Sequence, residues 1–166
     1  TAKGIALVNL LPVDLEEEVT VLLAMSSFPS DKFLLMATKG GVIKKTALSG
    51  FASIRRNGLI AMGLRNEDKL TSAGIVADED EVILVSRNGR AIRFQVKGLR
   101  IASRTSGGVR GIRLVDDFVV GMGIVFLDAH VLTVTEKGFG KLTPIKNYPV
   151  HNRGSMGVRT YRVSSK

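Results

Sequence analysis

The feature that most constrains the fold of this chain is an internal repeat of 49 residues. Similar text occurs three times, as FLLMATKGGVIKKT, EVILVSRNGRAIRF and HVLTVTEKGFGKLTP. Gly40, Gly89 and Gly138, which we expect in the turns, are 49 residues apart each time. In each copy two short apolar or β-branched runs flank a glycine-containing turn, which is the pattern of a β-hairpin. A repeat of this length indicates one supersecondary unit stacked against its neighbours.

The strand predictions follow the same order in each copy. In the second copy we predict strands at 81–86, 91–94, 108–114 and 119–126, with Asn88-Gly89 as a type I′ turn. The first copy has matching runs at 33–38, 42–46, 58–64 and 70–76, and further strands are predicted at 4–11 and 19–25. The side chains expected to be mostly core are Val82, Ile83, Leu84, Val85, Ile92, Phe94, Leu34, Leu35, Val42, Ile43, Val131, Leu132 and Val134.

These strands predict an all-β fold. About four short strands per 49 residues are typical of a propeller-like array of four-stranded blades, and a β-sandwich is the alternative. The chain then divides into the tail of a blade (1–27), two blades (28–77 and 78–127) and a partial blade (128–166). Three copies are too few for a closed disc, so we expect an excised fragment that forms an incomplete disc of about three blades. Its open strand edges would favour self-association.

Charged residues are distributed unevenly along the chain. The formal net charge is +9, which suggests a polyanionic partner such as nucleic acid. Eight bases and no acid lie in 82–114, and seven bases and no acid lie in each of 32–65 and 137–166. Glu67-Asp68 and Asp116-Asp117 lie between these windows, again 49 residues apart. We therefore predict a basic binding rim with a separate acidic zone, and the alternative is a solvated surface of mixed charge.

Other chemistry finds little support in the sequence. His130 and His151 are the only histidines and there is no cysteine, which argues against a metal site of nitrogen and sulfur ligands. The acids at 78–80 and 116–117 lack an alternating ligand loop, so they read as solvated turns. Gly138-Phe139-Gly140 lacks the following helix of a dinucleotide-binding motif. We expect no cofactor and no catalytic residue in this chain.

Two further expectations concern location and ligand. No apolar run is long enough to span a bilayer, no signal peptide precedes the chain, and the lack of cysteine fits a cytoplasmic protein. Aromatic residues make up only 5% of the chain, too few for a base-stacking platform, so the composition favours duplex over single-stranded nucleic acid.

Four strings carry a resemblance to a known family. ATKGGVIKKT, VSRNGRAIRF, TSGGVRGIRL and TEKGFGKLTP resemble the blades of the C-terminal domain of the DNA gyrase A subunit and, less closely, those of the topoisomerase IV A subunit. LVNLLP at 7–12 resembles the junction after that domain's second blade. The resemblance implies a β-pinwheel, a propeller-like disc whose blades exchange strands and whose basic perimeter binds and bends duplex DNA. In gyrase this wrapping supports negative supercoiling.

The resemblance also implies partners and an absent motif. The partners are double-stranded DNA, the B subunit, and the remainder of the A subunit. The DNA-cleaving tyrosine lies in a separate region, so Tyr148 is expected to pack or to cap the loop before Pro149, and Tyr161 is not expected to be catalytic. The family's wrapping motif Q-[RK]-R-G-G-[RK]-G is missing; HNRGSMG at 151–157 and TSGGVRG at 105–111 match it only in part, and 55–61 matches it only at Arg56 and Gly58.

Candidate DNA contacts are the bases of the return strands and long connections. They are Lys44, Lys45, Arg55, Arg56, Arg90, Arg93, Lys97, Arg100, Arg104, Arg110, Lys141 and Arg153. Such side chains would contact phosphates without reading bases. The 49-residue shift relates Arg93 to Lys44, and reversing both charges is expected to weaken DNA binding and leave the fold intact. The alternative is a protein-interaction propeller without DNA binding, which would need exposed aromatic or methionine anchors.

Overall fold

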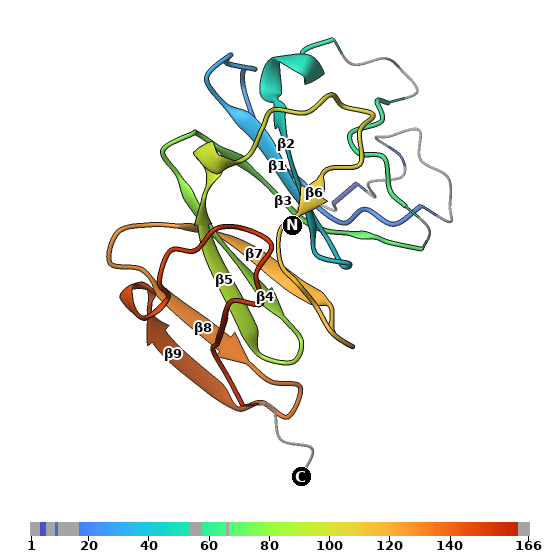
Figure 1. The fold of residues 1–166 in the computed structure, drawn as a ribbon. Coiled ribbons are helices and arrows are strands. Elements are labelled where there is room, and N and C mark those ends of the chain that lie inside the picture. The colour runs from blue at the N-terminus through green and yellow to red at the C-terminus, as the bar shows by residue number, and fades with distance from the viewer. Residues whose placement is uncertain (1–3, 6–8, 10–16, 54–57, 66, 163–166) are drawn as a thin grey trace.

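Residues 4–5, 9, 17–53, 58–65 and 67–162 are described by a computed structural model of the chain (Figure 1). Within these residues the regular structure consists of strands β1 to β10 and three single-turn 3₁₀ helices, and there is no α-helix. The all-β prediction is therefore confirmed.

Each repeat copy forms an antiparallel hairpin. In the first copy β1 (Phe33–Thr38) pairs with β2 (Val42–Ala47) and, on its other side, with β3 (Leu70–Val76). In the second copy β4 (Glu81–Ser86) lies between β5 (Arg90–Gln95) and β7 (Val119–Val125) in the same way. In the third copy β8 (His130–Val134) pairs only with β9 (Gly140–Pro144). We refer to these units as blades 1, 2 and 3.

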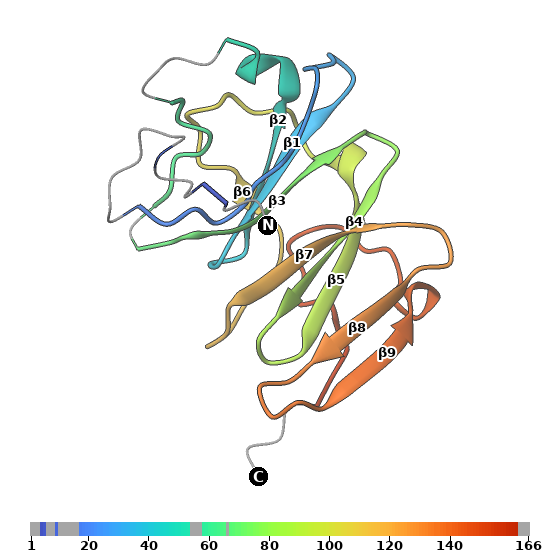
Figure 2. The ribbon, with the colours of Figure 1, turned by 180° about the vertical axis from the view of Figure 1, so that it is seen from behind.

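The fourth strand of each complete sheet comes from the following copy. The short strand β6 (Val109–Arg110) pairs with β2 of blade 1, and β10 (Val158–Arg159) pairs with β5 of blade 2. The sheet orders are therefore β3-β1-β2-β6 and β7-β4-β5-β10. Figures 1 and 2 show the three sheets as successive blades of an open arc, which together with the strand exchange confirms the β-pinwheel prediction.

The hairpin turns differ from the predicted type I′ geometry. Gly89 has a φ of 75°, whereas Asn88 is not among the residues with positive φ. The Gly89 amide donates to the Ser86 carbonyl at 3.0 Å, and the Ser86 hydroxyl accepts from the Arg90 amide at 3.2 Å. A turn that ends in a single left-handed glycine is the three-residue hairpin with a bulge. Gly138 takes the same position in blade 3, with a φ of 80°.

Within the first two hairpins the strand register gives a repeat distance of 48 residues, one fewer than the sequence indicates. Gly41, with a φ of 81°, is the structural counterpart of Gly89, so these turns are 48 residues apart. Leu35 pairs with Lys45 in blade 1 as Ile83 pairs with Arg93 in blade 2. The counterpart of Arg93 is therefore Lys45, and Lys44 corresponds to Ile92. The shift is 49 residues again at β3 and β7.

Two apolar clusters join the blades. The larger combines side chains of blades 1 and 2, including Leu35, Leu84 and Phe94. The smaller joins blades 2 and 3 and includes Ile83 and Tyr148, so the packing predicted for Tyr148 is confirmed. Of the predicted core, Val82, Ile83, Leu84, Ile92, Phe94, Leu35 and Ile43 are buried, and Val85, Leu34, Val42 and Val131 are half-buried.

Several sequence predictions are wrong. Leu132 and Val134 are 65% and 62% exposed, because no further blade among the described residues covers the face of blade 3. Residues 19–25 and 58–64 contain no strand. A strand needs a ladder of partners for its backbone N–H and C=O groups, and no strand pairs with either segment among the described residues, although Gly63 N donates to Ser106 O at 3.0 Å. The prediction for 4–11 falls largely outside the described residues.

Candidate nucleic-acid interface

Two basic connections carry the exchanged strands between blades. The first connection (96–113) begins at the 3₁₀ helix η3 (Val96–Gly98), and the second connection (145–162) begins at η4 (Ile145–Asn147). Each connection runs beside the return strand of the preceding blade, where Ala102 N donates to Lys45 O and His151 N to Arg93 O, both at 2.8 Å. Neither connection contains an acidic residue. Figure 1 shows the first connection, in yellow, crossing from blade 2 to the edge of blade 1.

The bases of the two connections repeat in pairs at the 49-residue shift. The pairs are Lys97 with Lys146, Arg104 with Arg153, Arg110 with Arg159, and Arg113 with Arg162. All eight side chains are exposed except that of Arg104, which is half-buried, and Arg100 is also exposed. The contacts expected from the sequence do not include Arg113, Lys146, Arg159 or Arg162. The shift that relates Arg110 to Arg159 and Lys97 to Lys146 was the signal that could have found two of them.

Acidic residues flank the opposite edge of each sheet. β3 and β7 are the edge strands farthest from β6 and β10 in the sheet order. Glu67 and Asp68 precede β3, and Asp116 and Asp117 precede β7. Asp68 Oδ1 accepts from Gly40 N at 2.8 Å, and Asp117 Oδ1 accepts from Asn88 N at 3.0 Å. These two carboxylates therefore stabilise the hairpin turns, and in blades 1 and 2 the bases of the connections and these four acids lie at opposite edges. Further acids, at 78–80, lie beside the start of the first connection, where Lys97 N donates to Asp78 O at 3.1 Å.

Lys44 lies inside the protein and not on the basic edge. Its side chain is 1% exposed, and Nζ donates to the carbonyls of Ala61 at 2.8 Å, Ser106 at 2.9 Å and Arg104. Burial removes water from the ammonium group, which lowers the pKa of Lys44 below its ordinary value. A side chain enclosed in this way does not reach a phosphate, so Lys44 leaves the candidate set.

Lys45 and Arg93 link successive blades. Lys45 is 3% exposed, and its Nζ binds Asp78 Oδ1 at 2.7 Å and Val96 O, at the start of η3, at 3.3 Å. Arg93 Nη1 donates to Ile145 O, at the start of η4, at 3.1 Å. Because Val96 and Ile145 are equivalent positions, the two bases make the same inter-blade contact. Their predicted role in DNA binding is not supported by this geometry.

Arg93 has further partners that hold it in place. Its Nε donates to Glu81 Oε2 at 2.7 Å and its Nη1 to Tyr148 O at 3.3 Å. Contrary to the expectation from the sequence, reversing the charges of Lys44 and Arg93 should disturb the fold, since both side chains bind backbone carbonyls of a connection that arrives from the next blade.

The remaining candidates are distributed as follows. Lys97, Arg100, Arg110, Lys141 and Arg153 are exposed, and Arg90 and Arg104 are half-buried. Lys141 donates to Thr160 O at 3.3 Å, and Arg90 pairs with Arg159 across β5 and β10. Arg55 and Arg56 lie outside the described residues. The candidate interface defined by the structure is thus the set of connection bases Lys97, Arg100, Arg104, Arg110, Arg113, Lys146, Arg153, Arg159 and Arg162, called the basic edge below.

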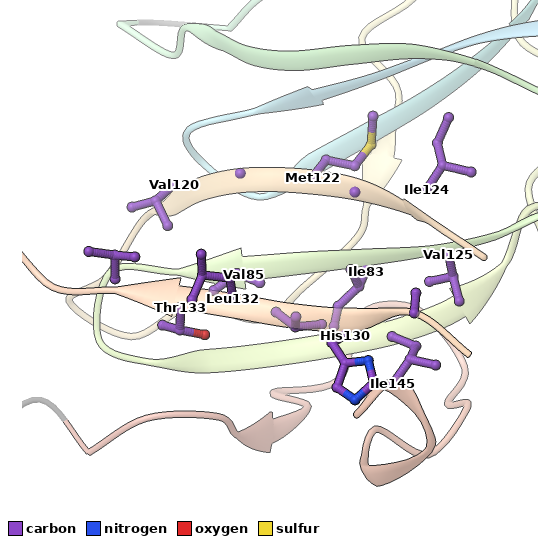
Figure 3. A pocket seen from close by; sticks show the side chains of 15 residues that line it. Ile83, Val85, Val120, Met122, Ile124, Val125, His130, Leu132, Thr133 and Ile145 are labelled. Atoms are coloured by element: carbon purple, nitrogen blue, oxygen red, sulfur yellow. The ribbon is translucent and has the colours of Figure 1, made fainter. Parts of the chain in front are cut away.

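An apolar groove of about 410 Å³ lies between blades 2 and 3 (Figure 3). Its fifteen lining residues come from β4, β7, β8 and the segments beside them, and only His130 and Thr133 among them have polar side chains. The lining has no carboxylate that could act with His130 in acid–base chemistry. We therefore interpret the groove as a gap in the packing between blades 2 and 3.

The outer face of blade 3 is the main exposed apolar surface of the hairpins. Leu132, Val134, Phe139 and Leu142 are each more than 60% exposed. In blade 2 the counterpart of Leu132 is Ile83, which the third blade buries. A contiguous surface of this kind favours contact with another protein segment.

No group of three His, Cys, Asp or Glu side chains comes together among the described residues in a way that could hold a metal ion. In the same part of the chain, no helix has the length and apolar character needed to cross a membrane.

The sequence comparisons agree on one protein family. The family model for the DNA gyrase C-terminal domain, beta-propeller, matches residues 32–77, 80–125 and 129–166. A DNA gyrase A subunit from Dehalogenimonas lykanthroporepellens is 46% identical over 167 residues, covering 100% of this chain and 20% of the relative. The DNA gyrase A subunit of Staphylococcus aureus is 37% identical over 99% of this chain and 19% of the relative. The chain spans about a fifth of the length of these relatives.

Solved structures agree with the sequence matches. The C-terminal domain of DNA topoisomerase IV superimposes with a TM-score of 0.88 at 25% identity, over 94% of this chain and 49% of that one. The DNA gyrase A C-terminal domain superimposes with a TM-score of 0.84 at 28% identity, over 95% of this chain and 53% of that one. Each matched domain is about twice as long as this chain. The repeat, the exchanged strands and these matches together show that the chain belongs to the family of DNA gyrase A C-terminal domains.

Proposed function

We propose that this domain binds duplex DNA without sequence preference along the basic edge and bends it. The observation that carries the proposal is the separation of charge within each blade. Bases crowd the edge formed by the exchanged strand, and acids flank the edges formed by β3 and β7. A polyanion lying along the exchanged strands would therefore meet mainly positive charge from blade to blade, although the acids at 78–80 lie beside the start of the first connection.

The chemistry of the basic edge suits phosphates. Lys97, Arg104 and Arg110 of the first connection are repeated by Lys146, Arg153 and Arg159 of the second, so the contacts recur with the blade and not with a base sequence. Lysine and arginine contacts to phosphates position a duplex without reading its bases. Because successive blades are arranged in an arc (Figure 2), a duplex that follows both connections has to bend.

In the parent protein this binding serves a type II DNA topoisomerase. We propose that the domain is part of a gyrase A subunit, that it works in the cytoplasm with the B subunit, together with the rest of the A subunit, and that DNA wrapping supports negative supercoiling. DNA cleavage and ATP hydrolysis are then carried out by parts of the enzyme outside this domain, and the domain itself needs no cofactor.

The salt dependence of duplex binding tests the proposal. If about six phosphates are engaged, the logarithm of the affinity falls with the logarithm of salt with a slope of about −5. Replacing Lys97 and Lys146 together by Gln is expected to reduce the steepness of that slope by about 2, equally for unrelated duplex sequences. Lys69→Gln is the matched control, because Lys69 is an exposed lysine beside the acidic edge and its loss should leave the slope unchanged.

Two outcomes would contradict the proposal. Binding that is insensitive to salt would show that phosphates are not the ligand, and an equal effect of Lys69→Gln would show that charge placement is irrelevant. A protein-interaction function is the second candidate, favoured by the exposed apolar face of blade 3. This function would be supported if the unmodified domain does not bind duplex DNA but self-associates, and if Leu142→Glu abolishes that self-association.

A further inference from the structure

Lys44 is a buried ammonium group held by backbone carbonyls. The group has three N–H donors, and it uses them on Ala61 O, Arg104 O and Ser106 O. Among the described residues no carboxylate forms an ion pair with it. Taking an ammonium group out of water is costly unless its donors are satisfied, so these three carbonyls are what keeps Lys44 buried.

The carbonyls belong to two separate parts of the chain. Ala61 lies in the segment that precedes β3, and Arg104 and Ser106 lie in the first connection, which arrives from blade 2. Ser106 O also accepts from Gly63 N at 3.0 Å. Lys44 therefore fastens residues 104–106 onto blade 1 at the point where the first connection turns towards β6.

Blade 2 holds its equivalent loop in another way. The structural counterpart of Lys44 is Ile92, which is fully buried. There the second connection is held by main-chain contacts, with Gly154 N donating to Gly111 O at 2.6 Å and Arg113 N donating to Ser155 O at 2.9 Å, and by Arg153 Nη1, which donates to Arg110 O at 3.3 Å. The contact of Lys44 with three carbonyls, called the clamp below, thus holds the first connection and has no counterpart at the equivalent position of blade 2. Arg104 and its counterpart Arg153 can therefore be compared as arginines with and without this contact.

We infer that Lys44 is a positioning residue for DNA binding, which acts by fixing the backbone of Arg104 so that this guanidinium lies on the basic edge. The inference rests on the proposed function and deepens it. Lys44 touches no phosphate itself. Its contribution passes through Arg104, whose own carbonyl it binds.

A double-mutant cycle on duplex binding tests the inference. Arg104→Gln is expected to reduce the steepness of the salt slope by about 0.9, the value for one phosphate. Lys44→Ile, which copies the residue at the blade 2 position, is expected to give the same change, and Lys44→Ile in the Arg104→Gln background is expected to give none. In the Arg153→Gln background Lys44→Ile should produce its full effect, because Arg153 is held by other contacts.

The outcomes separate the inference from the proposed function. If the unmodified domain shows no salt-dependent duplex binding, the proposed function fails. If that domain binds as expected but the Lys44 and Arg104 effects add, the inference alone is overturned. Equal losses from Lys44→Ile in the Arg104→Gln and Arg153→Gln backgrounds would also overturn it, because they indicate a general structural effect.

A measurement on the unmodified protein covers the case in which Lys44→Ile does not fold. The Lys44 ammonium protons should exchange slowly with water in a nitrogen–proton correlation spectrum, since three carbonyls enclose the group. Their cross-relaxation should place them beside residues 104–106. Ammonium protons that exchange as fast as those of exposed lysines would refute the clamp.

Discussion

Arg93 offers a sharp test of whether bases in this domain serve DNA or the fold. We consider Arg93→Leu, because the equivalent position of the third copy is Leu142, which pairs with Leu132 as Arg93 pairs with Ile83. The substitution keeps an apolar stem in the strand and removes the guanidinium. It removes the contacts of this group to Glu81, to Ile145 O and to Tyr148 O.

The expected loss in the free energy of unfolding follows from those contacts. The side chains of Arg93 and Glu81 are 18% and 20% exposed, so water screens the pair only in part. A hydrogen bond from a charged donor contributes about 1.5–3 kcal/mol, and the unpaired Glu81 carboxylate adds a desolvation cost. Discounted for the remaining exposure, the free energy of unfolding should fall by about 3 kcal/mol.

The loss should be concentrated at the junction of blades 2 and 3. Ile145 and Tyr148 belong to the second connection, so amide hydrogen exchange in β8, β9 and η4 is expected to accelerate more than exchange in β1 to β3. Urea denaturation measures the free energy. Arg87→Leu is the control, because its 4.0 Å pair with Glu136 is exposed on both sides and should contribute less than about 0.5 kcal/mol.

The prediction would be refuted by a change below about 1.5 kcal/mol for Arg93→Leu, which is the lower end of the range for one hydrogen bond from a charged donor. A clear reduction in the salt slope of DNA binding with no change in stability would also refute it, because that result would assign Arg93 to a phosphate. Removing Glu81 as well, as Arg93→Leu with Glu81→Leu, should recover part of the stability, since no unpaired carboxylate then remains.

Two further predictions concern packing and turn geometry. Phe94 is 2% exposed in the cluster shared by blades 1 and 2, so Phe94→Ala should cost about 3–5 kcal/mol, and an unchanged melting temperature would contradict its assigned position. A Cβ at Gly89 would lie 2.1 Å from Tyr161 O at a φ of 75°, so Gly89→Ala should destabilise the protein by about 1 kcal/mol or more and release residues 160–161, as increased amide exchange would show. Gly98→Ala, with open space around it, is the control that should leave exchange unchanged.

The hairpins could be predicted from the sequence because they are local. The predicted runs at 33–38, 70–76 and 81–86 match β1, β3 and β4 in full. The period of the repeat and the order of its copies predicted an array of blades, since each hairpin alone leaves an apolar face that a neighbour must cover. The clustering of bases in acid-free windows was visible for the same reason, because charge is a property of the sequence.

The tertiary structure decided which segments pair and which bases face water. Residues 19–25 have strand composition but form no strand, whereas the two-residue β6 forms because β2 lies beside it. Strand propensity is a property of one segment, but strand pairing requires two. Lys44 and Arg110 carry the same formal charge, yet one binds three carbonyls inside the protein and the other is exposed. A charge is left in water or enclosed according to what the neighbouring blade places around it, and that neighbour lies about 60 residues away in the sequence.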